Sequence, residues 1–180
     1  MKIVITGGPC SGKTTIINRL RDDGYKILEE VAREVIAERN FNRKLDATEM
    51  LELQKEIYDR QIKKEIDVDS LEETVFLDRG YVDNHAYCEH HIGYIPKWLL
   101  TAPVKRYDQI LVFERLPLIK DGIRRESDKE AKQIHDRIIC AYKNSGYEPI
   151  IVPVMSIEDR TEYVKKAVEK LISEKILVEG

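Results

Sequence analysis

Short apolar runs alternate along the chain with longer segments in which apolar residues recur at helical spacing. Such runs, rich in isoleucine, valine and leucine, are typical of buried strands, and the amphipathic segments between them are typical of helices. Strands that alternate with helices predict βαβ units, and therefore an α/β fold on a parallel sheet. We predict five strands, at Lys2–Thr6, Tyr25–Glu29, Thr74–Asp78, Gln109–Glu114 and Pro149–Val154.

The longest predicted helix runs from Asp46 to about Ser70, where apolar residues recur near the helical period. Another helix is predicted over Ser127–Asn144. A closing helix should follow Ser156, which forms a capping-box pattern with Asp159. With helices on both faces, the sheet would become the middle of a three-layer fold. Shorter helices are predicted at Thr14–Leu20 and Val31–Glu38.

The composition is that of a globular protein, because 42% of the 180 residues are hydrophobic and 35% are charged. At about 100–200 residues per domain, we expect one domain over residues 1–180. Lys and Arg total 30 against 33 for Asp and Glu, which argues against bulk nucleic-acid binding. The three cysteines are widely spaced, and no apolar stretch reaches the roughly 18 residues of a membrane span. We therefore expect a cytoplasmic protein.

The segment after the first strand matches the phosphate-binding pattern G-x-x-x-x-G-K-[ST]. Its glycines allow main-chain N–H groups to surround phosphate oxygens, and the following helix adds its positive N-terminal end. We expect Lys13 to reach the β- and γ-phosphates and the Thr14 hydroxyl to bind Mg²⁺. A plain glycine-rich turn is the alternative. The predicted nucleotide-binding residues are Gly7, Gly8, Pro9, Cys10, Ser11, Gly12, Lys13, Thr14 and Thr15.

Asp78 and Arg79 follow one another at the end of the third predicted strand and separate the classes of P-loop protein. A guanine-nucleotide switch carries an N-K-x-D motif, which this sequence lacks, and an AAA+ motor usually has Glu after its strand-end Asp. An Asp–Arg pair suits phosphoryl transfer, with Asp78 near the metal or an acceptor hydroxyl and Arg79 on phosphate. The alternatives are that Asp78 only caps the strand end and that Arg79 is a surface cation. We predict both residues as catalytic, and Asp78 with Thr14 as metal ligands.

Several stretches together resemble the P-loop nucleoside-kinase-like group of small ATPases, near the AAA-domain family that includes the nicotinamide riboside kinase domain of bacterial NAD regulators. The resemblance covers almost the whole chain and implies the P-loop NTPase fold and ATP binding. The stretches are GGPCSGKTT at Gly7, LEEVAREVI at Leu28, FLDRGYVDNHAY at Phe76, YDQILVFERLP at Tyr107 and DGIRRE at Asp121.

The resemblance also implies a carboxylate near the acceptor hydroxyl at Glu29, and catalytic lid arginines at Arg124 and Arg125. Residues 116–130 read as an exposed lid, although a solvated charged loop is the alternative. Glu29 closes the second strand at the carboxyl edge, where ligands of open α/β sheets bind. Because strand side chains alternate, we expect Glu29 to point to the acceptor and Glu30 elsewhere. Stabilisation of the next helix is the other role open to Glu29.

Further polar residues are candidates for an acceptor site. Gln54 could read a polar edge of the acceptor and Asp83 could meet its hydroxyl, although both could equally be helix-face residues. The histidines at 85, 90 and 91 lack the spacing of a zinc motif.

These observations favour an Mg-ATP-dependent kinase that transfers a phosphoryl group to a small nucleoside-like or nucleotide-like acceptor. The alternative is a regulatory ATPase or GTPase with slow hydrolysis and a protein or lipid partner. ATP and Mg²⁺ are the expected cofactors, GTP stays open as the donor, and a homodimer is compatible with the sequence.

Overall fold

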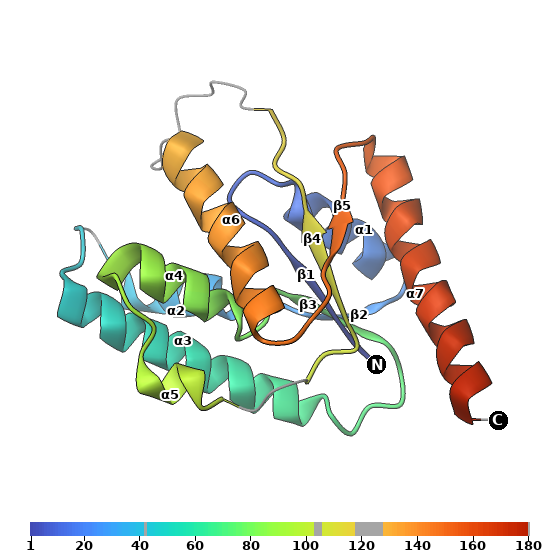
Figure 1. Cartoon of the computed structure of the whole chain (residues 1–180), viewed down its shortest axis with the longest axis horizontal. Helices are drawn as coiled ribbons and strands as arrows, with labels where there is room; N and C mark the ends of the chain where they lie inside the picture. The colour runs from blue at the N-terminus through green and yellow to red at the C-terminus, as the bar shows by residue number, and fades with distance from the viewer. Residues whose placement is uncertain (42, 103–105, 118–127, 180) are drawn as a thin grey trace.

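A parallel sheet of five strands forms the centre of the protein (Figure 1). The computed structural model describes residues 1–41, 43–102, 106–117 and 128–179. The strands pair in the order β2-β3-β1-β4-β5, which confirms the predicted α/β fold class. Their bounds are β1 (Lys2–Thr6), β2 (Lys26–Leu28), β3 (Val75–Asp78), β4 (Gln109–Phe113) and β5 (Ile150–Val152).

The register brings the carboxyl ends of the middle strands to one edge of the sheet. Ile5 of β1 pairs with Asp78 of β3, and Thr6 of β1 pairs with Val112 of β4. The loops that follow β1 and β3 therefore leave the sheet side by side. Ligands of open α/β sheets bind outside this edge.

Helices cover both faces of the sheet, as the periodicity predicted (Figure 1). The predicted long helix begins at Ala47, because Asp46 and Glu49 form a capping box. One short helix, Lys97–Leu100, was not predicted. The helices are α1 (Lys13–Asp22), α2 (Val31–Arg39), α3 (Ala47–Asp67), α4 (Asp83–Ile92), α5 (Lys97–Leu100), α6 (Asp128–Asn144) and α7 (Ile157–Glu179).

Alternating strand residues divide the core between the two faces. On one face, Ile3 and Ile5 of β1 pack with buried residues of α1 and α7. On the other, Val4 packs with buried residues of α4 and α6. These side chains are fully buried, and each contributes about 1.5–3 kcal/mol by leaving water. The unbroken apolar run of β1 thus supplies both halves of the core.

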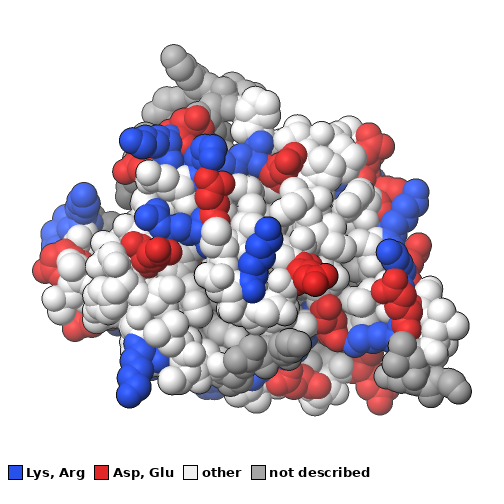
Figure 2. Space-filling view, viewed as in Figure 1, with Lys and Arg blue, Asp and Glu red and all other residues white. Residues whose placement is uncertain are grey.

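Helices α2 and α3 form a smaller apolar cluster beside the main core. Val31 and Val35 of α2 pack against Leu53 and Ile57 of α3. Acidic and basic side chains of the described residues are interspersed over the face seen in Figure 2. Among the described residues, no helix has the length and apolar character needed to cross a membrane.

Candidate active site

The loop between β1 and α1 turns tightly at the carboxyl edge of the sheet. Gly7 has φ 138°, and a Cβ atom there would lie 2.6 Å from the Phe113 carbonyl oxygen. Only glycine tolerates both the conformation and the close approach. Gly12 and Cys10 also have positive φ values, of 77° and 63°. The loop therefore has the tight backbone course that the phosphate-binding pattern predicts.

The Lys13 side chain folds over this loop and is buried, with 8% of its surface exposed. Its ammonium group donates to the carbonyl oxygens of Gly7 and Gly8, at 2.9 and 3.0 Å, and to Ser11 Oγ at 2.9 Å. Burial, followed by the charge of Arg79, lowers the pKa of Lys13 to about 7. An anion beside the ammonium group would favour its charged form. Lys13 is thus suited to meet phosphate.

Two residues that the sequence did not single out hold the outside of the loop. His135 Nδ1 on α6 accepts a hydrogen bond from the Gly8 N–H at 3.1 Å. Arg160 on α7 is buried, and its guanidinium donates to the Ser11 carbonyl at 2.7 Å. The loop is therefore held by the helices on both sides of the sheet.

Asp78 ends β3 in a buried position, with 4% of its surface exposed. Within the described residues, its Oδ1 atom has no hydrogen-bond partner. Burial, followed by the negative charge of Glu30, raises the pKa of Asp78 to about 6. A cation would relieve both effects, and a carboxylate with the exposed Thr14 hydroxyl is an oxygen donor set that suits Mg²⁺. The residues present fit the predicted metal.

Arg79 lies between β3 and the P-loop and is held by three partners. Its Nε donates to Glu30 Oε1 at 3.0 Å, and its Nη1 donates to Asp83 Oδ1 at 2.9 Å and to the Gly7 carbonyl at 3.2 Å. Burial acts to raise the pKa of Glu30, but the charge of Arg79, together with that of Arg33, outweighs burial and lowers it. At neutral pH this pair is therefore an ionised carboxylate against a guanidinium.

The predicted orientations of the two glutamates after β2 were wrong. Glu29 is exposed and forms an ion pair with Arg21, whereas Glu30 points to Arg79. The prediction extended strand alternation to Glu29, but β2 ends at Leu28. Glu30 is the N-cap of α2 and still has an extended backbone, with φ −60° and ψ 104°, so it is the last residue before the helix. The side chain at the carboxyl edge is Glu30.

Two cavities meet at this pair. One, of about 590 Å³, is lined by the P-loop from Pro9 to Thr14. The other lies between α2, α3 and α4. Its volume of about 280 Å³ is close to the lower end of the range for small-molecule sites. Glu30 and Arg79 line both cavities. Glu29 and Thr15 line neither of them.

The smaller cavity has an apolar wall with polar groups on α3 and α4. Asn84 Nδ2 donates to Gln54 Oε1 at 2.9 Å and to the Gln54 carbonyl at 3.2 Å, so the Gln54 amide N–H groups remain as donors. Gln54 therefore lines this cavity, and its contact with an acceptor stays a prediction. Leu53, Ile57 and Met50 supply apolar surface.

Asp83 also borders this cavity, but its carboxylate is occupied within the protein. Oδ1 accepts from Thr6 Oγ1 at 2.5 Å and from Arg79, and Oδ2 accepts from Tyr142 Oη at 2.7 Å and the Gly80 N–H at 3.2 Å. Asp83 thus anchors Arg79, in place of the predicted contact with an acceptor hydroxyl.

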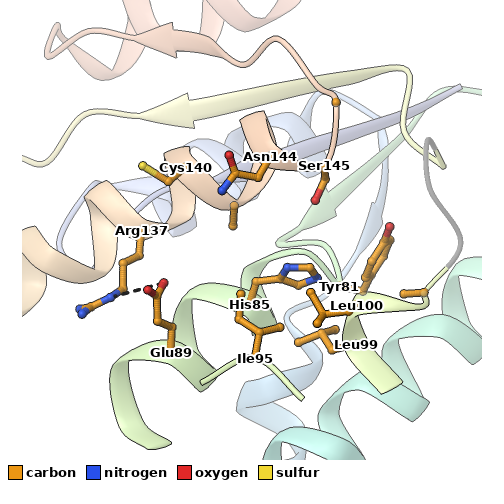
Figure 3. A pocket seen from close by; sticks show the side chains of 13 residues that line it. Tyr81, His85, Glu89, Ile95, Leu99, Leu100, Arg137, Cys140, Asn144 and Ser145 are labelled. Atoms are coloured by element: carbon orange, nitrogen blue, oxygen red, sulfur yellow. Dashed lines mark ion pairs between the residues drawn. The ribbon is translucent and has the colours of Figure 1, made fainter. Parts of the chain in front are cut away.

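A third cavity, of about 470 Å³, lies away from the P-loop between α4, α5 and α6 (Figure 3). Tyr81, His85 and Leu99 line it, and no P-loop residue does. Among the described residues, no group of three or more His, Cys, Asp and Glu side chains could hold a metal ion. Arg124 and Arg125 lie outside the described residues, as does most of the predicted lid.

The fold is shared with solved structures of low sequence identity. A deoxyadenosine kinase from M. mycoides, with products dCMP and dCDP bound, aligns with a TM-score of 0.71 and 16% identity, over 94% of this chain and 100% of that chain. The NadR protein in complex with NR aligns with a TM-score of 0.67 and 23% identity, over 94% of this chain and 51% of that chain. A thymidylate kinase from Candida albicans aligns with a TM-score of 0.61 and 17% identity, over 94% and 91% of the two chains.

No protein of curated function matches the sequence. The family model described as AAA domain matches residues 2–160, which include the P-loop, Glu30 and the Asp78–Arg79 pair. The chain belongs to the AAA domain family.

Proposed function

We propose that the protein is a kinase that transfers the γ-phosphoryl group of Mg-ATP to a hydroxyl of a nucleoside-like or nucleotide-like acceptor. The observation that carries the proposal is the position of Glu30 and Arg79, which line both the P-loop cavity and the smaller cavity. A phosphoryl group on the P-loop and an acceptor in the smaller cavity would meet at this pair. The kinase folds among the similar structures support the same reaction class.

Each charged group has a defined task in this reaction. Lys13 and the main-chain N–H groups of the loop neutralise the β- and γ-phosphates. The Glu30 carboxylate accepts the proton of the acceptor hydroxyl, a role that contributes about 10²–10⁴ in rate. Arg79 stabilises the charge on the transferring group, because its guanidinium reaches from Glu30 to the P-loop carbonyl of Gly7.

Thr14 and Asp78 would hold the metal that accompanies ATP. Bound Mg²⁺ supplies charge neutralisation and orients the phosphates. The buried Asp78 carboxylate, with its unpartnered oxygen, supports this assignment within the described residues. Arg124 and Arg125 remain proposed as additional cations on the transferring phosphate.

The smaller cavity beside the P-loop favours transfer over hydrolysis. Its wall combines apolar side chains with the paired amides of Gln54 and Asn84, which suits a planar ligand with polar edges. A regulatory ATPase with slow hydrolysis needs no such cavity beside its phosphate site. We therefore place the nucleoside-like part of the acceptor against α3 and α4.

The test compares Glu30→Gln with Glu29→Gln in a phosphoryl-transfer assay with labelled ATP and a panel of nucleosides and nucleotides. Glu30→Gln should lower kcat by about 10² or more, with ATP affinity unchanged, because the amide cannot accept the proton. Glu29→Gln is the matched control, since Glu29 pairs with Arg21 on the surface and should keep wild-type kcat.

Two outcomes would contradict the proposal. If wild-type protein hydrolysed ATP steadily but phosphorylated no member of the panel, the regulatory ATPase would be the better description. If Glu30→Gln kept wild-type kcat with an acceptor that the wild-type protein phosphorylates, Glu30 would not be the base.

A further inference from the structure

The main chain at Arg79 adopts a conformation that needs support. Arg79 has φ 72°, in the left-handed region that residues with a side chain rarely occupy. This conformation is unfavourable and persists only where the surroundings fix it. The Arg79 N–H donates to the Ile5 carbonyl at 3.0 Å, which fixes one end of the turn. The rest of the turn must be held from elsewhere.

The Tyr107 hydroxyl lies directly against the turn. It accepts a hydrogen bond from the Tyr81 N–H at 2.8 Å. A Cβ atom at Gly80 would lie 2.5 Å from the same hydroxyl oxygen, so only glycine allows the approach. Tyr107 is buried, and the segment that carries it leads into β4. A side chain from a distant part of the chain is therefore in contact with the turn that carries Arg79.

Glu65 of α3 fixes the position of this hydroxyl. Its Oε1 accepts from Tyr107 Oη at 2.7 Å and from Gln61 Nε2 at 2.9 Å. Gln61 Nε2 also lies 3.4 Å from the Arg79 carbonyl oxygen. One carboxylate oxygen thus orders two side chains that reach the main chain of residues 79–81, which Asp83 also reaches at the Gly80 N–H.

The burial of Glu65 is complete, with 0% of its surface exposed. A buried carboxylate is costly unless it is paired and hydrogen-bonded. Arg106 Nε lies 3.4 Å from Glu65 Oε2 and supplies the opposite charge. An apolar side chain at position 65 would avoid this cost but would leave Tyr107 without an acceptor. The buried Glu65 carboxylate therefore costs stability, but it holds the Tyr107 hydroxyl against the Arg79 turn.

We propose that Glu65 and Tyr107 are positioning residues that hold the Arg79 turn, and with it the guanidinium between the two cavities. The inference rests on the proposed kinase function for its effect on rate. Neither residue lines the P-loop cavity or the smaller cavity, so neither is expected to touch substrate. Displacement of a catalytic group by about 1 Å can cost up to 10² in rate.

The test uses Tyr107→Phe, which removes one hydroxyl and keeps the ring. We expect kcat to fall by about tenfold or more, while the Kd for Mg-ATP stays within about threefold of wild type. Glu65→Leu should lower kcat at least as much. Glu65→Gln keeps an acceptor oxygen, so its kcat should be about fivefold higher than that of Glu65→Leu. A purely structural role would lower Tm without changing the kcat of the folded fraction.

Tyr147→Phe is the matched control. The Tyr147 hydroxyl accepts from the Arg106 N–H at 2.9 Å, and its ring centroid lies 5.8 Å from that of Tyr107. This variant should keep wild-type kcat even if its Tm falls. If Tyr107→Phe also kept wild-type kcat at a temperature where it is folded, the proposal would be wrong.

A second measurement separates this proposal from the proposed function. In an ¹⁵N NMR spectrum, the Arg79 Nε–H signal can be identified by its loss in Arg79→Lys. We expect it to shift or broaden in Tyr107→Phe and to stay in place in Tyr147→Phe, whether or not any acceptor is phosphorylated. An Arg79 signal unchanged in Tyr107→Phe would overturn the positioning role. If no acceptor were phosphorylated but the Arg79 signal shifted in Tyr107→Phe, only the kinase assignment would be overturned.

Discussion

The Nδ1 atom of His135 accepts a hydrogen bond from the main-chain N–H of Gly8 over 3.1 Å. This contact joins α6 to the P-loop across 127 positions of sequence. The imidazole can accept only while Nδ1 carries no proton. Burial lowers the pKa of His135, so the folded protein favours the neutral form that the contact needs.

Acid should therefore weaken this contact. Because the pKa of His135 is lower in the folded protein than its ordinary value of about 6.5, the unfolded chain binds the proton more readily. The stability from neutral His135 is complete above about pH 6.5 and is lost as pH falls from there through the lowered pKa.

His135→Gln provides the comparison, since an amide oxygen accepts the same bond without titrating. We expect its Tm to depend less steeply on pH than wild-type Tm between about pH 7 and pH 5. His85 and His91, whose pKa values are also lowered by burial, titrate in both proteins, so the difference isolates His135. If the plots of Tm against pH ran parallel for the two proteins, protonation of His135 would not affect stability.

Replacement of Lys13 by Ala should remove catalysis and leave the fold in place. Within the described parts of the chain, the hydrogen bonds of the Lys13 ammonium group go to loop atoms of Gly7, Gly8 and Ser11. Loss of one preorganised cation at the phosphates should lower kcat by about 10²–10³. Lys132→Ala, on the exposed face of α6, is the control and should keep wild-type kcat. Turnover of Lys13→Ala near the wild-type rate would contradict the assignment of the loop.

The fold and the phosphate loop could be predicted from the sequence because their signals are local. The unbroken apolar run Ile3, Val4 and Ile5 predicts a buried strand, and its residues are buried on both faces of the sheet. The glycine spacing from Gly7 to Gly12 predicts a tight loop, and both glycines have positive φ values. Each of these inferences needs only neighbouring residues.

The remaining parts of the site depend on contacts between distant residues. Arg160 lies 149 positions from Ser11, to which it donates, and nothing in the local sequence around Arg160 indicates that contact. The choice between Glu29 and Glu30 depended on where β2 ends, which is the least reliable part of a pattern. Glu65 lies on a helix of 21 residues, and its burial depends on the packing of Tyr107 against it.

Arg160 should be important for stability because it satisfies three carbonyl groups. Its guanidinium donates to Ser11 and Pro153 at 2.7 Å each and to Glu114 at 3.0 Å. Arg160→Met keeps much of the volume but leaves these oxygens without a donor, so we expect a loss of about 2–4 kcal/mol in urea unfolding. Arg19→Met, at an exposed position of α1, should change the free energy of unfolding by less than about 0.5 kcal/mol.

Asp83→Asn tests the carboxylate that anchors Arg79. The Asp83 oxygens accept from Arg79 and from three other donors, those of Thr6, Gly80 and Tyr142. An amide replaces one accepting oxygen with an NH₂ group, which would face two donors and repel them. We expect the free energy of unfolding to fall by about 1–3 kcal/mol. We also expect kcat to fall by about tenfold or more, because Arg79 loses a charged partner.

The matched comparison is Tyr142→Phe, which removes one donor to Asp83 but keeps the carboxylate and its contact with Arg79. This variant should lose stability because a buried hydrogen bond is missing, by about 0.5–1.5 kcal/mol. Its kcat should fall less than that of Asp83→Asn, since the charge that faces Arg79 is retained. Urea unfolding and steady-state kinetics at one temperature measure both effects. If the two variants lost the same kcat, the charge of Asp83 would not be what positions Arg79, and packing around α6 would account for both losses.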